Sequence, residues 1–139
     1  MGRILAIDYG LKRTGLAVTD PLQIIATALE TVETSSLAGF LKSYLQKETV
    51  DEVVIGMPKK LNNEDSDTAA SVRKFMEVFK MTFPAMKIIE VDERFTSALA
   101  HQAMISGGMK KKDRQVKGNV DKISATLILQ SYLQTKSLR

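Results

Sequence analysis

The chain has 139 residues, of which 44% are hydrophobic and 26% charged, and its formal net charge is +4. This size suits one domain with its own core, so we expect a single domain over residues 1–139. The absence of cysteine and the single histidine exclude disulfides, cysteine-based zinc or redox sites and multi-histidine metal sites. No apolar run is long enough to cross a membrane, and we expect a cytoplasmic protein.

The first twenty residues contain an apolar run, residues 4–7, that ends on a carboxylate, Asp8. Gly10 and Gly15 follow, and a second apolar run covers residues 16–18. This pattern predicts a buried strand, a tight turn that glycine allows, and a second, antiparallel strand. A carboxylate at the end of a buried strand needs a cationic partner. Arg13 or a divalent metal ion could meet this need, and this stretch favours neither.

The remaining elements follow from changes in hydrophobic period. Residues 24–32 predict a third strand of the same meander, and the apolar stripe from Leu37 to Leu45 predicts a helix with Ser35 or Ser36 as its N-cap. Residues 51–56 predict a strand, and the apolar run within it suggests a central strand with both faces buried. A polar loop over residues 57–65 follows that strand.

The second half alternates between helices and one more strand. Ser66 or Asp67 can cap a helix that Pro84 closes, and residues 87–91 predict a strand. A further helix is expected from Thr96 to the glycine pair at 107–108. A basic loop over residues 107–118 then leads to a last helix over about residues 119–136.

This order of elements predicts an α/β fold with a mixed five-stranded sheet. Three strands form an antiparallel meander, two more run parallel, and helices cover both faces. Ligands of such sheets bind outside the carboxyl ends of the parallel strands. Asp8, the loop after residue 56 and the pair Asp92-Glu93 are all expected at that edge.

Three acidic positions have both a functional and a structural interpretation. Asp92 and Glu93 precede a predicted helix, and Asp121 lies in the first turn of another, so each can simply stabilise a helix dipole. Strand alternation predicts that only one of Asp92 and Glu93 faces Asp8. Ser124 and Ala125 are small enough to let the last helix approach the sheet closely, which would bring Asp121 near the strand ends.

Carboxylates from distant parts of the chain suggest a metal site made of oxygen ligands. Mg²⁺ takes a few carboxylates and keeps water molecules. Two such ions about 3.5–4 Å apart can activate a water and stabilise the leaving oxygen in phosphodiester cleavage. This chemistry requires neither histidine nor cysteine, in agreement with the composition.

Four motifs in order resemble the YqgF/RuvX family of the RNase H-like superfamily, which is related to the RuvC resolvases. They are Asp8-x-Gly10-x-x-Arg13-x-Gly15-x-Ala17-x-x-Asp20, Gly56-x-Pro58, Asp92-Glu93-Arg94-x-Thr96 and Asp121-x-x-Ser124-Ala125-x-x-Ile128-Leu129. The resemblance implies an RNase H-like fold and a nuclease that depends on Mg²⁺ or Mn²⁺. By match, the catalytic and metal-binding acids are Asp8, Glu93 and Asp121, with Asp92 as a weaker metal ligand.

The family is described as a nuclease for the 5′ end of pre-16S rRNA and also as a Holliday-junction resolvase. The resemblance therefore implies precursor rRNA or branched DNA as the partner. Cations near the expected site can bind phosphates without reading sequence, although a charge run is often only a solvated surface. The candidates are Arg13, Lys59, Lys60, Arg94, Lys110, Lys111, Lys112, Arg114 and Lys117.

Two other classes of function remain open. The spacing Asp-x-Gly-x-x-x-x-Gly also resembles the phosphate loop of the actin and sugar-kinase superfamily, but those proteins need two such domains and this chain has the length of one. A non-catalytic RNA-binding factor in ribosome assembly is the other alternative. A resolvase that cuts two strands symmetrically would need a two-fold dimer, whereas an RNA-trimming enzyme could be a monomer.

Overall fold

The computed structural model describes residues 2–57, 68–92 and 117–137, except for the side chains at 92, 117–123 and 137. Five strands form one sheet in the order β3-β2-β1-β4-β5. They are β1 (Arg3–Asp8), β2 (Arg13–Thr19), β3 (Ala26–Glu33), β4 (Val50–Met57) and β5 (Lys87–Asp92). The first three form an antiparallel meander, while β4 runs parallel to β1 and β5 parallel to β4. The predicted mixed sheet is therefore confirmed.

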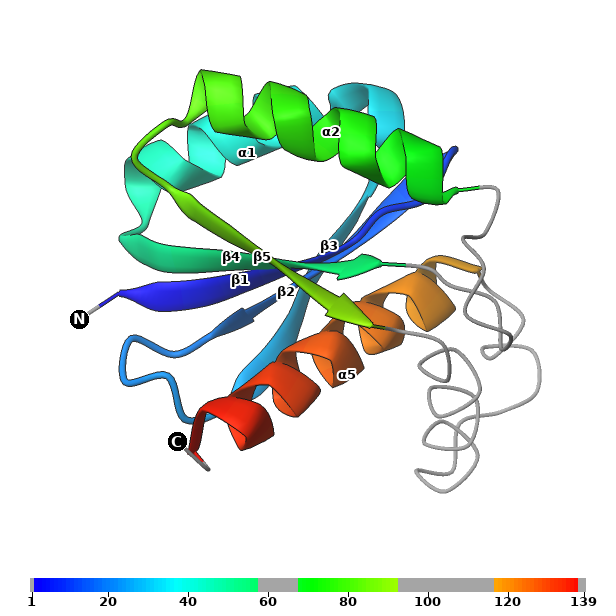
Figure 1. Ribbon diagram of the computed structural model, residues 1–139. Coiled ribbons are helices and arrows are strands. Elements are labelled where there is room, and N and C mark those ends of the chain that lie inside the picture. The colour runs from blue at the N-terminus through cyan, green and yellow to red at the C-terminus, as the bar shows by residue number, and fades with distance from the viewer. Residues whose placement is uncertain (1, 58–67, 93–116, 138–139) are drawn as a thin grey trace.

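Helices cover both faces of the sheet, as predicted (Figure 1). The helices α1 (Leu37–Lys47) and α2 (Ala69–Thr82) lie on one face, and α5 (Lys117–Ser137) crosses the other. A short 3-10 turn, η1 (Thr34–Ser36), joins β3 to α1. Of the helices that the structure describes, none has the length and apolar character needed to cross a membrane.

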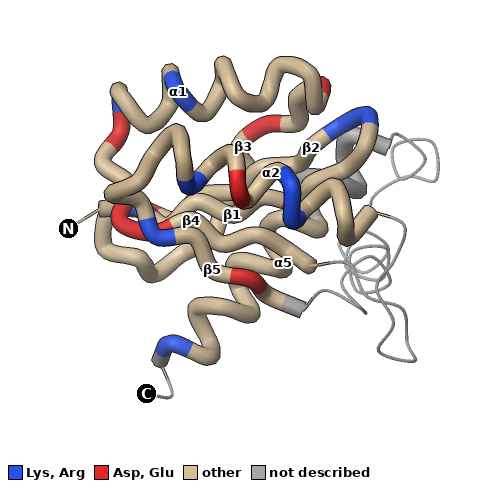
Figure 2. The backbone as a smooth tube through the Cα atoms, turned by 45° about the horizontal axis from the view of Figure 1, so that its top comes forward, with Lys and Arg blue, Asp and Glu red and all other residues tan. Residues whose placement is uncertain are grey.

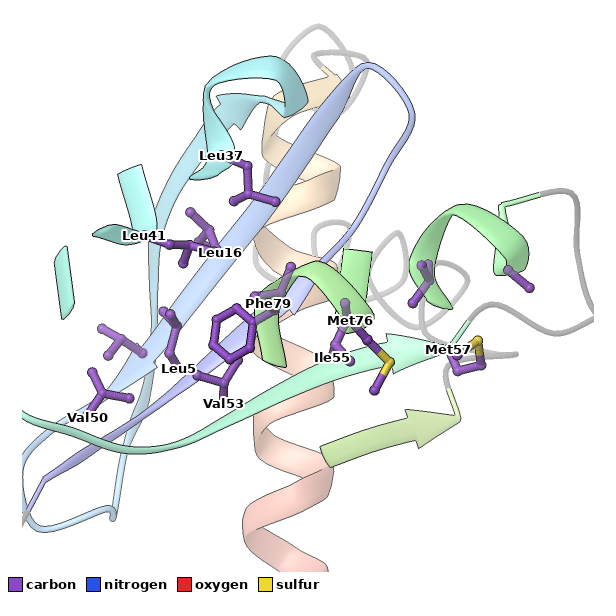
Figure 3. Close-up of a cluster of buried hydrophobic side chains, with 14 residues drawn as sticks. Leu5, Leu16, Leu37, Leu41, Val50, Val53, Ile55, Met57, Met76 and Phe79 are labelled. Atoms are coloured by element: carbon purple, nitrogen blue, oxygen red, sulfur yellow. The ribbon is translucent and has the colours of Figure 1, made fainter. Parts of the chain in front are cut away.

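The alternation of side chains along the strands divides the core into two layers. In β1, Leu5 and Ile7 belong to the cluster under α1 and α2, whereas Ile4 and Ala6 belong to the cluster under α5. Figure 3 shows the first cluster, where Leu37, Leu41, Met76 and Phe79 from the helices pack on Leu5, Leu16, Val50, Val53, Ile55 and Met57 from the sheet. The strands β1 and β4 are buried on both faces because each has a helix layer on either side.

The start of β3 differs from its prediction. The strand begins at Ala26 rather than Ile24, because Asp20 holds the preceding backbone in a turn. Its Oδ1 accepts hydrogen bonds from the amides of Ile24 and Ile25, each at 2.8 Å. The β-branched side chains of these two isoleucines favour a strand, but the Asp20 carboxylate accepts the hydrogen bonds of their amides and holds them in the turn.

The helix starts agree with their predictions in part. Ser36 takes the N-cap position of α1, as predicted, but it makes no side-chain capping bond because the chain is already helical through η1. Thr68 takes the N-cap position of α2, also without a side-chain bond, and the predicted caps Ser66 and Asp67 lie outside the described residues. The last helix begins at Lys117, so the end of the predicted basic loop belongs to α5.

Candidate active site

The carboxyl ends of β1, β4 and β5 share one edge of the sheet. Ile7 pairs with Ile55, and Ile55 with Glu90, so the last residues of the three strands end nearly level. Asp8 is the last residue of β1 and is half-buried. It follows Ala6 by two positions, which places it on the sheet face that α5 covers. Its oxygens suit a hard divalent cation such as Mg²⁺, which takes carboxylate ligands.

The turn after Asp8 is held from two sides. The Thr34 hydroxyl donates to the Gly10 carbonyl at 2.6 Å, and the Thr34 amide donates to the Lys12 carbonyl at 2.9 Å. The Tyr9 ring packs against Phe75 of α2 with 5.2 Å between the ring centroids. A β-carbon at Gly10 would lie 2.2 Å from the Arg13 carbonyl oxygen, so no other residue fits this backbone.

A buried carboxylate anchors the far end of α5. Glu52, 8% exposed, lies near the start of β4. Its Oε2 accepts a hydrogen bond from the Tyr132 hydroxyl at 2.6 Å, and its Oε1 pairs with Lys136. The Lys87 ammonium lies 3.8 Å from the same carboxylate. Because the last turns of α5 lie beside the amino end of β4, the helix begins at the edge where Asp8 lies, as Figure 1 shows.

The charge state of Glu52 follows from these contacts. Burial alone would raise the pKa of Glu52, but the hydrogen bonds from Lys136 and Tyr132 and the charges of Lys136 and Lys87 outweigh it. The pKa of the Glu52 carboxyl therefore lies below its ordinary value. The group stays ionised at neutral pH and ties β4, β5 and α5 together.

The helix α5 packs closely on the sheet at its small residues, as the sequence predicts. Ser124 and Ala125 are both buried, and Ala125 shares a cluster with Ala6 and Ala17 of the sheet. Asp121 precedes Ala125 by one helical turn. The backbone of α5 therefore brings position 121 to the same end of the fold as Asp8.

The other predicted site residues are described only in part. Asp92 ends β5, while Lys117 and Asp121 lie in the first two turns of α5, and their side chains are outside the description. Arg13 begins β2 beside the turn and is exposed. The remaining predicted residues lie outside the described ranges, and they are Lys59, Lys60, Glu93, Arg94, Lys110, Lys111, Lys112 and Arg114. Among the side chains that are described, no three acidic or histidine groups form a cluster.

Two hollows lie away from the Asp8 edge. One, of about 580 Å³, lies between the end of α1 and the chain that leads into β5, and it is lined by Leu45, Phe83 and Met86 among others. The other, of about 460 Å³, lies between Ile25 and Leu133, beside the turn from β2 to β3. Both are at the opposite end of the strands from Asp8.

The residues that position the site were not found from the sequence. No motif of the sequence indicates the contacts that Thr34, Glu52 and Tyr132 make. The one available signal was Glu52, an acid that follows Asp51 and directly precedes the apolar part of its strand. Such a residue requires a partner when it is buried, but its partner lies 80 positions away, and no local pattern links the two.

Comparison with known proteins agrees with this arrangement. The model of the RuvX family, described as Holliday junction resolvase, matches residues 2–135, which is nearly all of the chain.

The chain belongs to the RuvX family.

Relatives of this RuvX chain cover almost its whole length. A protein of Phocaeicola vulgatus, named "Putative pre-16S rRNA nuclease", is 55% identical over 136 residues, which are 98% of both chains. A protein of the same name from Bacteroides fragilis is 54% identical over 138 residues, 99% of this chain and 100% of the relative. The structure of Thermus thermophilus RuvC with a Holliday junction substrate superposes with a TM-score of 0.60 at 16% identity, and covers 97% of this chain and 96% of that one. The RuvC-like, RNase H-like fold is thereby confirmed.

Proposed function

We propose that this RuvX chain is a divalent-metal-dependent nuclease that trims the 5′ end of precursor 16S rRNA by phosphodiester hydrolysis. The observation that carries the proposal is the common edge at which β1, β4 and β5 end and α5 begins. The pre-16S rRNA substrate follows from the names of relatives more than 50% identical to this chain. Action on this precursor makes the cytoplasm the proposed location.

The backbone supports Asp8 and Asp121 as metal ligands on one face. Ala6 and Ala125 share a buried cluster. Asp8 lies two strand positions after Ala6, and Asp121 lies one helical turn before Ala125, so both lie nearer the edge of the sheet on the same face. Eleven positions of helix from Tyr132 back to Asp121 span about 16 Å, and the five strand positions from Glu52 to Met57 also span about 16 Å. The Glu52–Tyr132 bond thus holds α5 in a register that brings position 121 level with the end of β4.

The alternation of β5 favours Glu93 over Asp92 as the third ligand. Ile89 and Val91 belong to the cluster under α5, so the next position of that face along the chain is 93. We therefore propose Asp8, Glu93 and Asp121 as the catalytic, metal-binding acids, with Asp92 as an accessory ligand. Mg²⁺ or Mn²⁺ bound there would supply Lewis acidity for attack by water and for departure of the leaving oxygen.

The chain's own residues would then bind and orient the phosphodiester. Arg13, exposed beside Asp8, would hold a substrate phosphate without reading sequence. Figure 2 shows Lys and Arg residues, in blue, at the start of β2, at this edge of the sheet. Further phosphate contacts are proposed for Lys59, Lys60, Arg94, Lys110, Lys111, Lys112, Arg114 and Lys117.

The test is cleavage of two labelled substrates, a precursor 16S-like RNA and a four-way DNA junction, with Mg²⁺, with Mn²⁺ and with chelator. Asp8→Asn removes the charge and keeps the shape, and we expect its cleavage rate to fall by at least about 100-fold, because even outer-sphere partners of metals contribute 10–100-fold. Glu90→Gln is the control, since Glu90 is an exposed acid of β5 outside the α5 cluster. Its rate should match the wild type.

A readout that needs no cleavage accompanies this assay. Mg²⁺ and Mn²⁺ should raise the unfolding temperature of the wild type and of Glu90→Gln, but not of Asp8→Asn, because a ligand that binds only the folded state stabilises it. Binding of both substrates without cleavage in either metal would refute the nuclease and favour the RNA-binding assembly factor.

A Holliday-junction resolvase is the second candidate, and the description of the matching family model favours it. Cleavage of the junction but not of the RNA would identify this activity. Symmetric cutting of two strands requires two sites related by a two-fold axis, so a resolvase should bind the junction as a homodimer. Trimming of RNA by a monomer needs one site. The mass of the complex with each substrate, measured by light scattering in chelator, distinguishes the two.

A further inference from the structure

The turn between β1 and β2 presents an apolar side chain to solvent beside Asp8. Leu11 is 64% exposed, and both of the following residues, Lys12 and Arg13, are exposed cations. A single exposed leucine is common on protein surfaces and has no significance by itself. What distinguishes this one is its position three residues after the proposed metal ligand and the rigidity of the turn that carries it.

The turn is fixed on both sides of Leu11. Thr34 binds the carbonyl oxygens of Gly10 and Lys12, the residues on either side of it, at 2.6 and 2.9 Å. The hydroxyl groups of Thr34 and Thr14 are themselves hydrogen-bonded at 3.0 Å, so the contact continues into β2. With both neighbouring carbonyls held against η1, the Leu11 side chain stays largely exposed, and it belongs to neither core cluster among the described residues.

An apolar side chain followed by two cations suits one feature of nucleic acids. Proteins unstack bases by inserting leucine or similar wedges between them, while cations hold the adjacent phosphates. In RNA, bases of single-stranded ends and loops are already free to be splayed and packed against side chains. A continuous duplex offers its bases only at a stacking penalty.

We propose that Leu11 packs against an unstacked nucleobase next to the scissile phosphate, while Lys12 and Arg13 bind the phosphates on either side of that nucleotide. This inference rests on the proposed nuclease function and specifies its substrate. The site accepts a nucleotide in a single-stranded end or at a strand junction and discriminates against an uninterrupted duplex. Leu11 is a specificity-determining residue, whereas Asp8 belongs to the chemistry.

The chain contains a matched control for this leucine. Leu22 is 65% exposed and also lies in a tight turn, but that turn joins β2 to β3 at the opposite end of β2. Leu11→Ala and Leu22→Ala therefore remove the same exposed apolar surface at the two ends of one strand. Leu11→Phe is a rescue variant, because an aromatic ring can stack on a base. All three should keep the unfolding temperature of the wild type.

The experiment measures binding in chelator, where no cleavage occurs, to RNAs with 2-aminopurine at each nucleotide around an unpaired segment. The fluorescence of this base rises when it is unstacked. We expect a rise at one position with the wild type and Leu22→Ala, and none with Leu11→Ala. Leu11→Phe would stack on the base and quench it, so its rescue is measured as an affinity for this RNA close to that of the wild type. In the proposed complex the bound base buries the Leu11 side chain, so Leu11→Ala should bind this RNA about tenfold more weakly than the wild type does. Binding of a fully paired duplex should weaken less than twofold.

The outcomes separate this inference from the nuclease proposal. A fluorescence rise that depends on Leu11, in a protein that cuts neither substrate in any metal, supports the wedge and refutes the nuclease. Cleavage that falls in Asp8→Asn but is equal in Leu11→Ala and Leu22→Ala refutes the wedge alone. Equal weakening of the single-stranded and duplex substrates by Leu11→Ala, or no binding of either by the wild type, also overturns it.

Discussion

Replacing Tyr132 with Phe should destabilise the fold through one hydrogen bond. Both partners are buried, Tyr132 at 6% and Glu52 at 8% exposure, and their oxygens are 2.6 Å apart. Phenylalanine retains the ring and its packing, so the change removes the donor to an ionised carboxylate. Hydrogen bonds to charged groups contribute about 1.5–3 kcal/mol, and we expect the free energy of unfolding to fall by about 2 kcal/mol.

For a chain of 139 residues the unfolding entropy is about 0.3 kcal/mol per degree, so the melting temperature should fall by about 7 °C. Calorimetry and urea unfolding at neutral pH measure the two quantities. Tyr44→Phe is the control, because Tyr44 is a half-buried tyrosine whose pKa is raised by burial and whose ring stacks on Phe40. Its loss of a hydroxyl should change stability by less than about 0.5 kcal/mol.

The pH dependence tests whether the lost energy is electrostatic. The pKa of Glu52 is lowered in the folded state, so the stability that it contributes is present above the pKa of an unfolded glutamate and is lost as the pH falls through the folded pKa. The difference between wild type and Tyr132→Phe should therefore be largest near neutral pH and shrink in acid. A difference below about 0.5 kcal/mol at neutral pH, or one unchanged in acid, would refute this account.

Two further predictions concern the turns at either end of β2. Gly10→Ala should lower stability by about 1–3 kcal/mol and reduce cleavage, because the new methyl group would lie 2.2 Å from the Arg13 carbonyl oxygen. Gly39→Ala in α1 is the control, and it should be neutral or stabilising because a β-carbon there meets nothing within 4 Å. Equal effects of the two substitutions in urea unfolding would contradict this prediction. Hydrogen bonds from the Ile25 and Ile24 amides lower the pKa of Asp20, so the stability that its carboxylate contributes should be lost as the pH falls through that lowered pKa. Asp20→Asn should therefore flatten this part of the acid unfolding curve, and an unchanged curve would contradict the prediction.

The sequence was informative wherever burial follows a simple period. The run from Ile4 to Ile7 and the stripe containing Leu37 and Leu41 are buried as their spacing predicts, and the two parallel strands follow from the order of elements. The errors lie at boundaries. The strand prediction for Ile24 is wrong because the Asp20 carboxylate accepts the hydrogen bond of its amide. Ser36 takes the predicted N-cap position, but it makes no side-chain bond because the chain is already helical through η1.

Part of the candidate site was likewise predictable from the sequence, and part was not. Asp8 was predictable because it ends a buried strand, and its place at the shared edge is confirmed. The roles of Asp8, Glu93 and Asp121 as ligands stay predictions. The contact between Glu52 and Tyr132 is not predictable in this way, because strand and helix periodicity indicate which face is buried but not which polar atoms meet across 80 residues.

The position of α5 in the chain has a consequence for the order of synthesis. This helix follows every strand of the sheet, and it covers one face with Ala125, Ile128, Leu129 and Tyr132. A nascent chain that has made all five strands still exposes that apolar face and lacks position 121. The proposed nuclease would therefore acquire its last acid and its complete core in a single late step, so an unfinished chain could not cut RNA.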